Sequence, residues 1–494
     1  MKSYVIAVDQ STSATKALLF DENGALLNNV SIAHRQYYPR EGWVEHDPVE
    51  IYANTVEAIR KVVAGYDGDG SSFSLALTNQ RETVVVWERG TGRPVYNAVV
   101  WQCLRGKDIC DRLRAEGWSG LVKERSGLLI DPYFAGSGAK WILDNVDGVR
   151  EAAERGELCM GTIDSWLVFR LTGGRVHATD YTNASRTMLF NIHTLDWDDD
   201  LLRMLTIPRS MMPEPRPGDA EYGETTVEGL FPEPIAIAGV LGDSHGALAG
   251  QMCFAEGLGK VTYGTGSSVM VNIGERPSDP PEGLVTSVGF AALGKVFYAF
   301  EGNIHCTGAT IAWLKDELRL IDSPSEIEAI ATSVESNGGV YFIPAFAGLA
   351  APWWHPEVKA QICGLTLGSG KAQVCRAALE SIGYQVKDLV DAMVGSAGIS
   401  LRELRVDGGP TKNRFLMQFQ ADLLGVPIVR SEVEDACAYG AFIMNGFARG
   451  KWKSFEEAAE HWAREGGWLP RSENGARVAS DYAGWREAVN QLIK

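Results

Sequence analysis

Hydrophobic and polar positions along the chain form two similar strand–turn–strand units. Residues 4–21 contain a buried-strand run that ends in an acid, a polar turn and a second strand. Residues 260–273 have the same arrangement around a turn of glycines and hydroxyl residues. Thr12 and Thr265, at the two turns, lie 253 residues apart, about half of the 494-residue chain. One such unit in each half indicates two domains of related architecture.

Between and after these units, strand patterns alternate with helix patterns. Residues 49–64 have the apolar spacing of an amphipathic helix, and residues 74–78 and 83–87 are strand-like runs. In the second half, residues 371–394 predict a long amphipathic helix that ends at a nearby glycine, and residues 413–424 predict another. This alternation predicts an α/β fold.

Composition and charge exclude several classes of protein. Hydrophobic residues make up 45% of the chain and charged residues 22%, which excludes wholesale disorder. The 46 basic and 63 acidic residues give a net charge of −17. An acidic surface repels the phosphates of nucleic acid and anionic lipid, so we expect neither as a partner. No apolar stretch approaches the ~18 residues of a membrane span, so we expect no membrane segment.

The cysteines and the first residues predict the compartment. The eight cysteines are scattered, with no CxxC pair and no Cys/His cluster of zinc spacing. Such cysteines are typical of reduced, buried thiols. Residues 1–3 lead directly into a strand pattern without a signal peptide. We therefore expect a cytoplasmic protein.

Several common catalytic motifs are absent from the sequence. Every Gly-Lys pair lacks the following Ser or Thr of a Walker A loop, and HRD, DFG, GxSxG and HExxH motifs do not occur. What remains are turns of glycine and hydroxyl residues that follow strands. Such turns direct backbone N–H groups and hydroxyls to one point, which suits a phosphate group.

The first of these turns lies in the N-terminal hairpin. Thr12 and Ser13 could donate hydrogen bonds to phosphate, while Lys16 offsets its charge. Asp9, at the end of the strand, could hold Mg²⁺ directly or through water, because carboxylates with waters are the usual ligands of that ion. The alternative is an ordinary hairpin tip with a solvated Asp and Lys.

Two more turns and one acid follow strands in the same way. The turn at residues 264–266 is a candidate phosphate nest, and residues 406–413 form a glycine-rich turn that opens a helix. Each turn alone could be an ordinary connection, but the three together favour a nucleotide site. Asp243 follows an apolar strand at residues 234–241, where the default alternative is a plain helix N-cap.

Longer motifs extend over nearly the whole chain. The most characteristic is Leu77-Thr78-Asn79-Gln80-Arg81-Glu82-Thr83, with Val100-Trp101-Gln102-Cys103 after it. Further segments are Asp131-Pro132-Tyr133-Phe134, Ala351-Pro352-Trp353-Trp354 and Asp407-Gly408-Gly409. Together they resemble the FGGY carbohydrate kinases, and among them the glycerol kinases.

The resemblance implies two actin-like α/β domains, of the ribonuclease H type, around a central cleft. Residues 1–247 would bind the sugar or polyol and carry the phosphate hairpin, and residues 248–494 would bind the nucleotide. The implied activity is an ATP-dependent transfer of the γ-phosphoryl group to a hydroxyl of glycerol or a related small polyol, with ATP and Mg²⁺ as cofactors. The resemblance also implies a homo-oligomer, a dimer or a tetramer.

The resemblance also implies roles for individual residues. Asp243 matches the general base, which takes the proton of the attacking hydroxyl. Asp9 and Asp243 match the metal positions. The substrate-binding positions are Arg81, Glu82, Trp101, Tyr133, Asp243 and Ser244. The ATP-binding positions are Thr12, Ser13, Lys16, Thr265, Gly308, Gly409 and Asn413.

The order of Arg81 and Glu82 in the chain agrees with a shared substrate. Neighbouring side chains on a strand face opposite ways, so these two can meet one substrate only past the end of the strand. The sequence places them there, in the link after Thr78. An Arg donor beside a Glu acceptor satisfies hydroxyls that both donate and accept.

The departures from the glycerol kinase pattern lie at the substrate. Ser244 and His245 replace the two Gln that follow the base in that pattern, and Ser268 replaces an aromatic wall. These changes make the pocket larger and more polar, which favours the alternative of a kinase for a four- or five-carbon polyol or ketose. Another alternative is a sugar-binding sensor with weak or no kinase activity. The retained Asp243 argues against it, because a pure sensor needs no base.

Overall fold

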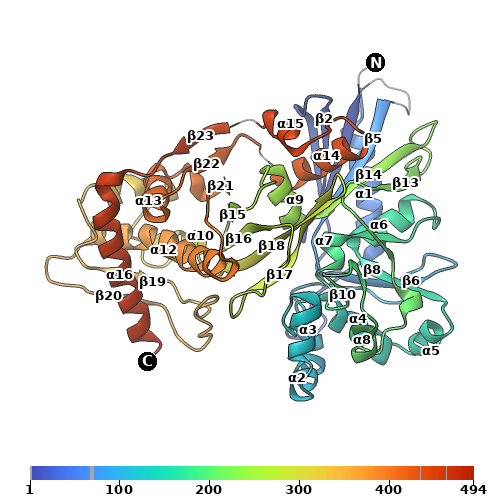
Figure 1. Ribbon diagram of the computed structural model, residues 1–494, viewed down its shortest axis with the longest axis horizontal. Helices are drawn as coiled ribbons and strands as arrows, with labels where there is room; N and C mark the ends of the chain where they lie inside the picture. Colours follow the sequence, from blue (N-terminus) through green and yellow to red (C-terminus); the bar gives the residue numbers. More distant parts are fainter. Residues whose placement is uncertain (1–2, 67–71, 434, 463) are drawn as a thin grey trace.

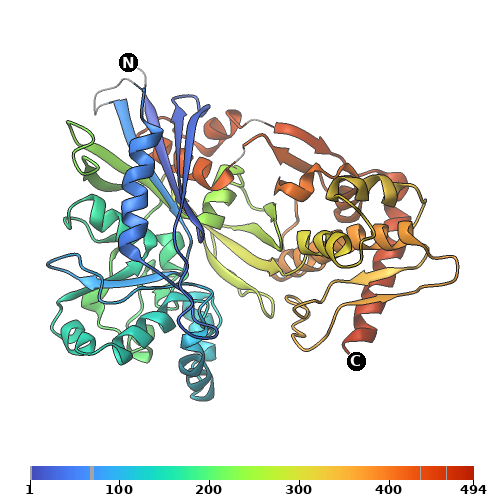
Figure 2. The ribbon, with the colours of Figure 1, turned by 180° about the vertical axis from the view of Figure 1, so that it is seen from behind.

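The protein, as a computed structural model, is described for residues 3–66, 72–433, 435–462 and 464–494. Two sheet-rich lobes lie side by side, the N-terminal lobe in blue to green and the C-terminal lobe mainly in yellow to red (Figure 1). The view from behind shows the same division (Figure 2). Strands and helices alternate in both lobes, so the predicted α/β fold is confirmed.

The N-terminal lobe is built on a six-stranded sheet. Its strands are β1 (Tyr4–Gln10), β2 (Ala14–Asp21), β3 (Leu26–Ala33), β5 (Phe73–Asn79), β13 (Glu221–Thr225) and β14 (Ile235–Gly242). Their order in space is β13-β14-β5-β1-β2-β3. β1, β5 and β14 run parallel, whereas β1, β2 and β3 form an antiparallel meander. The parallel pairing brings the carboxyl ends of three strands to one edge.

The rest of this lobe consists of shorter strands and of helices. The strands are β4 (Glu45–His46), β6 (Val84–Glu88), β7 (Ala98–Val99), β8 (Leu158–Thr162), β9 (Ala178–Asp180), β10 (Phe190–Asn191), β11 (Asp196–Trp197) and β12 (Glu214–Arg216). The helices are α1 (Pro48–Val62), α2 (Lys107–Ala115), α3 (Ser119–Ser126), α4 (Ala135–Asn145), α5 (Val149–Glu154), α6 (Ile163–Leu171), α7 (Tyr181–Ala184) and α8 (Asp199–Met204). Helix α1 matches the helix predicted at residues 49–64, and the carboxylate of its N-cap, Asp47, accepts a hydrogen bond from the Val49 N–H.

The C-terminal lobe is built on a seven-stranded sheet. Its strands are β15 (Leu258–Tyr263), β16 (Ser267–Gly274), β17 (Val285–Ala292), β18 (Lys295–Ile304), β21 (Glu403–Gly408), β22 (Ile428–Ser431) and β23 (Arg464–Trp468). The order is β17-β18-β16-β15-β21-β22-β23, with β15, β21 and β22 parallel. A separate pair is formed by β19 (Tyr341–Ile343) and β20 (Gln361–Cys363).

The helices of the C-terminal lobe lie beside this sheet or farther out, on other helices (Figure 1). They are α10 (Gly308–Asp316), α11 (Ile327–Thr332), α12 (Lys371–Ala397), α13 (Arg414–Leu424), α15 (Phe455–Glu460) and α16 (Gly475–Leu492). The sequence predicts that the helix at residues 371–394 stops at Gly395 or Gly398. Helix α12 passes Gly395 and ends where Gly398 adopts a left-handed backbone with φ of 66°.

The β1 strand is buried on both faces, so it carries a continuous apolar run instead of an alternating one. Ile6 and Val8 pack into a core beneath α1 and α6. Val5 and Ala7 face the other way, into a core shared with residues of the C-terminal half such as Phe442. The first hydrophobic run of the sequence thus connects the two halves of the molecule.

Helices α9 (Asp243–Gly250) and α14 (Ala436–Ala448) join the lobes. They pack closely because glycines face each other: a Cβ on Gly440 would lie 1.9 Å from the carbonyl oxygen of Gly246. Helix α14 also lies against β5 and β14, where Asn445 accepts a hydrogen bond from Ser74 and donates one to the Ala238 carbonyl. A helix from the C-terminal half therefore covers the N-terminal sheet.

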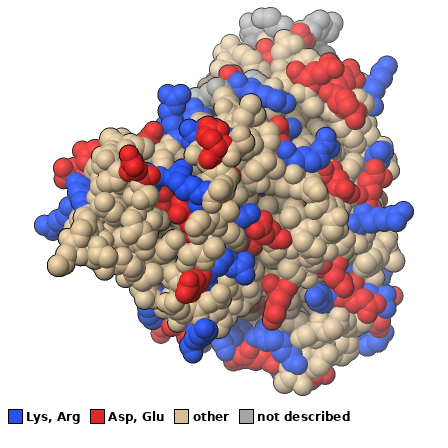
Figure 3. Space-filling view, turned by 60° about the vertical axis from the view of Figure 1, so that its left-hand side comes forward, with Lys and Arg blue, Asp and Glu red and all other residues tan. Residues whose placement is uncertain are grey.

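The distribution of surface charge and the hydrophobicity of the helices can be compared with the partners expected from the sequence. Acidic and basic side chains are interspersed over the face in Figure 3. Within the described part of the chain, no helix is long and apolar enough to cross a membrane.

The glycine contact between α9 and α14 generates a stability prediction. Gly440→Ala pushes the two helices apart and should destabilise the protein by about 1–3 kcal/mol, the usual cost of overpacking. Chemical denaturation followed by tryptophan fluorescence measures the change.

The matched control is Gly395→Ala, which adds a Cβ with nothing within 4 Å in the interior of α12. It should stabilise the protein by about 0.5–1 kcal/mol, because alanine loses less backbone entropy than glycine on folding. Equal effects of the two substitutions would contradict the importance of the close contact.

Candidate active site

The carboxyl ends of three parallel strands meet at one edge of the N-terminal sheet. Gln10 of β1 lies opposite Asn79 of β5, and Asn79 lies opposite Gly242 of β14. Arg81 and Asp243 follow these strand ends directly in the chain. The prediction that Arg81 lies past the end of its strand is confirmed, since β5 ends at Asn79.

A cavity of about 740 Å³ lies beside this edge, between the lobes. Every residue expected to bind substrate lines it: Arg81, Glu82, Trp101, Tyr133, Asp243 and Ser244. Further lining residues are Thr12, Arg186, Thr262, Gly264, Gly266, Ser268, Glu301, Asn303, His305 and Trp354. Residues from both halves of the sequence thus form one cavity, and we take it as the candidate active site.

A buried charge cluster of Arg81, Glu82, Arg186 and Glu301 forms one wall. Arg81 donates from both terminal nitrogens to Glu301, at 2.7 and 2.8 Å, and from Nε to Asp243 Oδ1 at 3.0 Å. Arg186 donates to Glu82 at 2.5 Å and lies 2.9 Å from Glu301. The four side chains are at most 5% exposed. Glu301 belongs to β18, so a carboxylate of one lobe holds the arginines of the other.

The cluster shifts the pKa values of its acids in opposite directions. Burial alone would raise the pKa of Glu301, but Arg186 and Arg81 outweigh it and hold that pKa well below its usual range. For Glu82 burial dominates over Arg81 and Arg186, so its pKa is raised. Glu301 is therefore the fixed counter-charge of the cluster.

Arg186 and Glu301 are not among the site residues predicted from the sequence. A signal was present, because Glu301 is a charged residue inside the apolar run of β18 and Arg186 precedes the apolar residues 188–190. Charged residues in such runs are fully buried only when they are paired. Their partners lie about a hundred or more residues away, at Glu82 and Arg81, so no local pattern identifies them.

Asp243 is the first residue of α9, one position after the N-cap Gly242. The alternative of a plain N-cap is therefore wrong. Its Oδ1 accepts hydrogen bonds from Arg81 and from the Ser244 N–H, the latter at 2.6 Å. Its side chain is 33% exposed and lines the cavity. The second carboxylate oxygen has no hydrogen-bond partner among the residues described here, so it is available to a bound molecule.

The two residues after Asp243 differ in their surroundings. Ser244 lines the cavity. His245 is fully buried and its Nε2 lies 3.0 Å from Ser287 Oγ. Burial and then Arg81 lower the pKa of His245 far below its usual value, which keeps the ring neutral. His245 thus supports the wall without touching the cavity.

The tip of the first hairpin carries an acidic pair around one lysine. Lys16 Nζ lies 2.8 Å from Asp435, the N-cap of α14, and 3.5 Å from Asp9. Asp9 is 4% exposed, so the alternative of a solvated acid at this tip is wrong. Burial raises the pKa of Asp9 to about 8, with further contributions from Asp435 and Asp243. Asp435 is a site residue that the sequence analysis did not name.

Among the remaining ATP-binding candidates one lines the cavity and the others lie around it. Thr12 lines it and accepts a hydrogen bond from the Trp101 indole at 2.9 Å. The Gly308 N–H donates to Gly264 at 3.0 Å, which places the start of α10 on the second hairpin turn, beside Thr265. The parallel pair β15–β21 ends at Tyr263 and Gly408, so Gly409 follows next to that turn. Asn413 lies further along the chain, where its Oδ1 caps α13 by accepting from the Leu416 N–H. Ser13 lies at the first hairpin tip.

The acids fit a magnesium ion that is held mainly through water. Asp9 Oδ1 is buried without a hydrogen-bond partner. No three acids, histidines or cysteines of the described residues stand close enough to coordinate a metal by themselves. Mg²⁺ commonly binds one or two carboxylates and completes its shell with waters and substrate phosphates. Asp9 and Asp243 agree with that kind of site.

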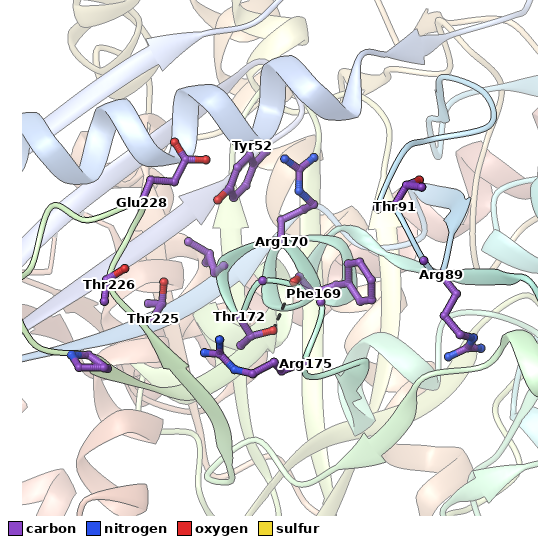
Figure 4. A pocket seen from close by; sticks show the side chains of 16 residues that line it. Tyr52, Arg89, Thr91, Phe169, Arg170, Thr172, Arg175, Thr225, Thr226 and Glu228 are labelled. Atoms are coloured by element: carbon purple, nitrogen blue, oxygen red, sulfur yellow. Dashed lines mark hydrogen bonds between the residues drawn. The ribbon is translucent and has the colours of Figure 1, made fainter.

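A second cavity, of about 550 Å³, lies wholly in the N-terminal lobe (Figure 4). Its arginines already have partners: Arg170 stacks on Tyr52, Arg175 donates to the Glu224 carbonyl, and Arg89 donates to the carbonyls of Leu158 and Ser210. None of the site residues predicted from the sequence lines it. The cavity between the lobes remains the candidate.

Comparisons with known proteins agree with this geometry. The N-terminal domain model of the FGGY family of carbohydrate kinases matches residues 4–250, and the C-terminal domain model matches residues 259–449. Glycerol kinase 2 of Thermotoga maritima is 49% identical over 99% of both chains, and a glycerol kinase of Bacillus cytotoxicus is 46% identical, also over 99% of both.

Solved structures give the same result for the fold. A glycerol kinase of Plasmodium falciparum, crystallised with ADP, superposes with a TM-score of 0.94 at 31% identity, over 100% of this chain and 98% of that one. A gluconate kinase of Lactobacillus acidophilus, at 20% identity, has a TM-score of 0.91 over 100% and 99% of the chains and supports the fold alone. The predicted pair of actin-like domains is confirmed.

Fold and relatives together define a two-lobed phosphotransferase with an alcohol group as acceptor. The chain belongs to the FGGY family of carbohydrate kinases. The resemblance drawn from the motifs is thereby confirmed.

The charge cluster generates a prediction for Glu301→Gln. The substitution keeps the shape of the side chain but leaves two buried arginines short of one negative charge. Breaking a buried ion pair in this way should cost about 3–5 kcal/mol of stability. Because Arg81 loses its position in the cavity, kcat/KM should also fall about 10²-fold. Denaturant unfolding and steady-state kinetics measure the two effects.

Glu275→Gln is the matched control, since Glu275 is 54% exposed and pairs with Lys295 at 3.1 Å on the surface. It should change stability by no more than about 0.5 kcal/mol. If Glu301→Gln changed stability and kcat/KM as little as this control, the charge cluster would neither stabilise the contact between the lobes nor position Arg81.

Proposed function

We propose that this chain is an ATP-dependent kinase that transfers the γ-phosphoryl group to a terminal hydroxyl of glycerol or a related small polyol. One observation carries the proposal: the Asp243 carboxylate lies in the same cavity as Arg81 and Glu82 and next to the phosphate-type hairpin, and one of its oxygens has no hydrogen-bond partner among the described residues. Relatives named glycerol kinase, at up to 49% identity, support the acceptor class.

The cavity wall suits a polyol. Arg81 uses three of its five N–H groups on Glu301 and Asp243, so two remain for substrate hydroxyls. Glu82 can accept from hydroxyls on the same side. Trp101 and Tyr133 meet edge to face, with ring centroids 5.5 Å apart, and offer an apolar surface to the carbon chain.

Asp243 acts as the general base in this proposal. Arg81 and the Ser244 N–H hold Oδ1, so the other oxygen is aimed at the attacking hydroxyl and takes its proton. A positioned carboxylate base contributes about 10²–10⁴-fold to such a transfer. The hydroxyl oxygen then bonds to the γ-phosphorus while the bond to the ADP oxygen breaks.

The hairpin tips and the turn beside Asn413 would hold ATP. Thr12 and Ser13 donate to phosphate oxygens, and Lys16 offsets their charge. Thr265, Gly308 and Gly409 border the nucleotide on the C-terminal lobe. Mg²⁺, held by Asp9 and Asp243 through water, would neutralise charge on the phosphates.

A second candidate substrate follows from two serines. Ser244 and Ser268 both line the cavity, where the glycerol kinase pattern has larger side chains. The space and polarity that they leave favour a four- or five-carbon polyol or ketose. Each missing apolar group changes specificity by only ~1–3 kcal/mol, so glycerol would still react.

Three further predictions stay predictions. They are the domain division at residues 247 and 248, which falls inside α9, the homo-oligomeric state, and the cytoplasmic location. A sensor without kinase activity is disfavoured, because it would need no carboxylate at the position of Asp243.

The experiment is ADP release with Mg·ATP and a panel of glycerol, erythritol, pentitols and four- and five-carbon ketoses. Asp243→Asn should lower kcat about 10²–10⁴-fold, because the amide cannot take the proton. Binding of the acceptor should persist, since Arg81, Glu82 and the aromatic wall are intact.

Asp316→Asn serves as control, because Asp316 is exposed on α10 and its one ion pair within the described part of the chain is with its neighbour Lys315, at 2.8 Å. It should leave kcat unchanged. Equal activity of Asp243→Asn and the wild type would refute the role of Asp243, and no ADP release with any acceptor would refute the kinase.

A further inference from the structure

The face of the C-terminal sheet that borders the cavity carries a row of polar side chains. Ser268 of β16 lies opposite Thr262 of β15 on one side and opposite Asn303 of β18 on the other. Directly opposed residues project to the same side of a sheet. Glu301, two residues before Asn303, projects there as well. All four line the cavity, so this row continues the wall that the charge cluster begins.

A lysine ammonium is buried behind the row. Lys260, two residues before Thr262 on β15, is 1% exposed. Its Nζ lies 3.3 Å from Thr262 Oγ1 and 3.3 Å from Ser268 Oγ. It forms no ion pair within 4.0 Å among the residues that the structure describes. A buried charge of this kind is costly. Its hydrogen-bond partners among the described residues are these two hydroxyls, and the Asp407 carboxylate, which lies farther away, interacts with it electrostatically.

The ammonium determines the direction of the hydroxyl protons. An ammonium group only donates hydrogen bonds, so Thr262 and Ser268 accept from Lys260, and each keeps one proton to donate. Thr262 is hydrogen-bonded to the Asp407 carboxylate. For the proton of Ser268 no acceptor exists in the described part of the chain. Ser268 is half-buried at the cavity, so its O–H is available to a bound molecule.

The environment makes this O–H a strong donor. A positive charge behind a hydroxyl polarises it, and the low dielectric of the wall increases the effect. Asn303, directly across from Ser268, is exposed to the cavity, and its side-chain amide has no hydrogen-bond partner among the described residues. Its NH₂ group is a second donor at the same place.

We propose that Ser268, backed by Lys260, and Asn303 form a subsite for a substrate oxygen that only accepts hydrogen bonds. Such an oxygen is the carbonyl of a ketose or the carboxylate of a sugar acid. The substrate is then a four- or five-carbon chain with this group near Ser268 and a terminal hydroxyl at Asp243. This inference rests on the proposed kinase function and leaves its bond changes as they are: the hydroxyl oxygen takes the phosphoryl group and Asp243 takes the proton.

The test compares acceptors of one length: erythritol, erythrulose and erythronate, with glycerol as reference, in kcat/KM. The wild type should prefer erythrulose or erythronate over erythritol by about tenfold or more, the value of one strong hydrogen bond. Whichever of the two wins identifies the carbonyl or the carboxylate as the group bound.

The variants are Ser268→Ala, Lys260→Met and the double substitution. Each single change should reduce the preference about tenfold, and the double change should reduce it no further than the larger single one, because the two residues act as a unit. Lys260→Arg, which keeps the charge, should retain the preference. Ser268→Ala carries the test by itself if Lys260→Met does not fold.

Two results would overturn the inference while leaving the kinase intact. One is a wild-type enzyme whose kcat/KM for erythritol equals its kcat/KM for erythrulose and erythronate. The other is a Lys260→Met variant that loses activity equally on all acceptors while Ser268→Ala loses none, which would make Lys260 structural. If no acceptor were phosphorylated, the proposed function would fail and this inference with it.

Discussion

The guanidinium of Arg81 is the point on which the two lobes and the cavity converge. A buried cation is tolerated only when opposite charges surround it, and Arg81 obtains them from both lobes: Asp243 beside it and Glu301 on β18. The same contacts orient the carboxylate that faces the cavity. The relative position of the lobes, of Asp243 and of Arg81 is therefore one electrostatic arrangement, in which none of the three can move without exposing an unpaired charge.

Helix α14 connects the same parts of the molecule through packing contacts. Its glycine face packs on α9, which begins with Asp243, and its N-cap Asp435 pairs with Lys16 of the first hairpin. One helix of the C-terminal half thus connects Asp243, the hairpin tip and the N-terminal sheet. Because α14 contacts β5 and β14 as well, the strands that lead to the site are covered by a segment 207 to 371 residues further along the chain.

Local patterns in the sequence predict a large part of this structure. The hairpin at residues 4–21, the helices at residues 371–394 and 413–424, and the position of Arg81 past its strand all follow from periodicity, glycine stops and strand alternation. Glu301 and Asp435 do not follow, because their partners are 220 and 419 residues away and only the folded chain brings them together. The sequence predicts which residues end each strand. The opposite charges that stabilise those residues in their positions come from the other lobe, so they depend on how the two lobes pack together.

The distribution of charge then bears on how an acidic chain accepts a nucleotide. The buried charge cluster contains two arginines and two glutamates, so it is nearly neutral by itself. Around the hairpin, Lys16 pairs with both Asp9 and Asp435, and Asp243 is near enough to add to their negative charge. Burial raises the pKa of Asp9, and the charges of Asp435 and Asp243 raise it further. A bare polyphosphate would be repelled there. A nucleotide that arrives with a divalent cation would relieve this repulsion, which supports the proposal that ATP binds as its magnesium complex.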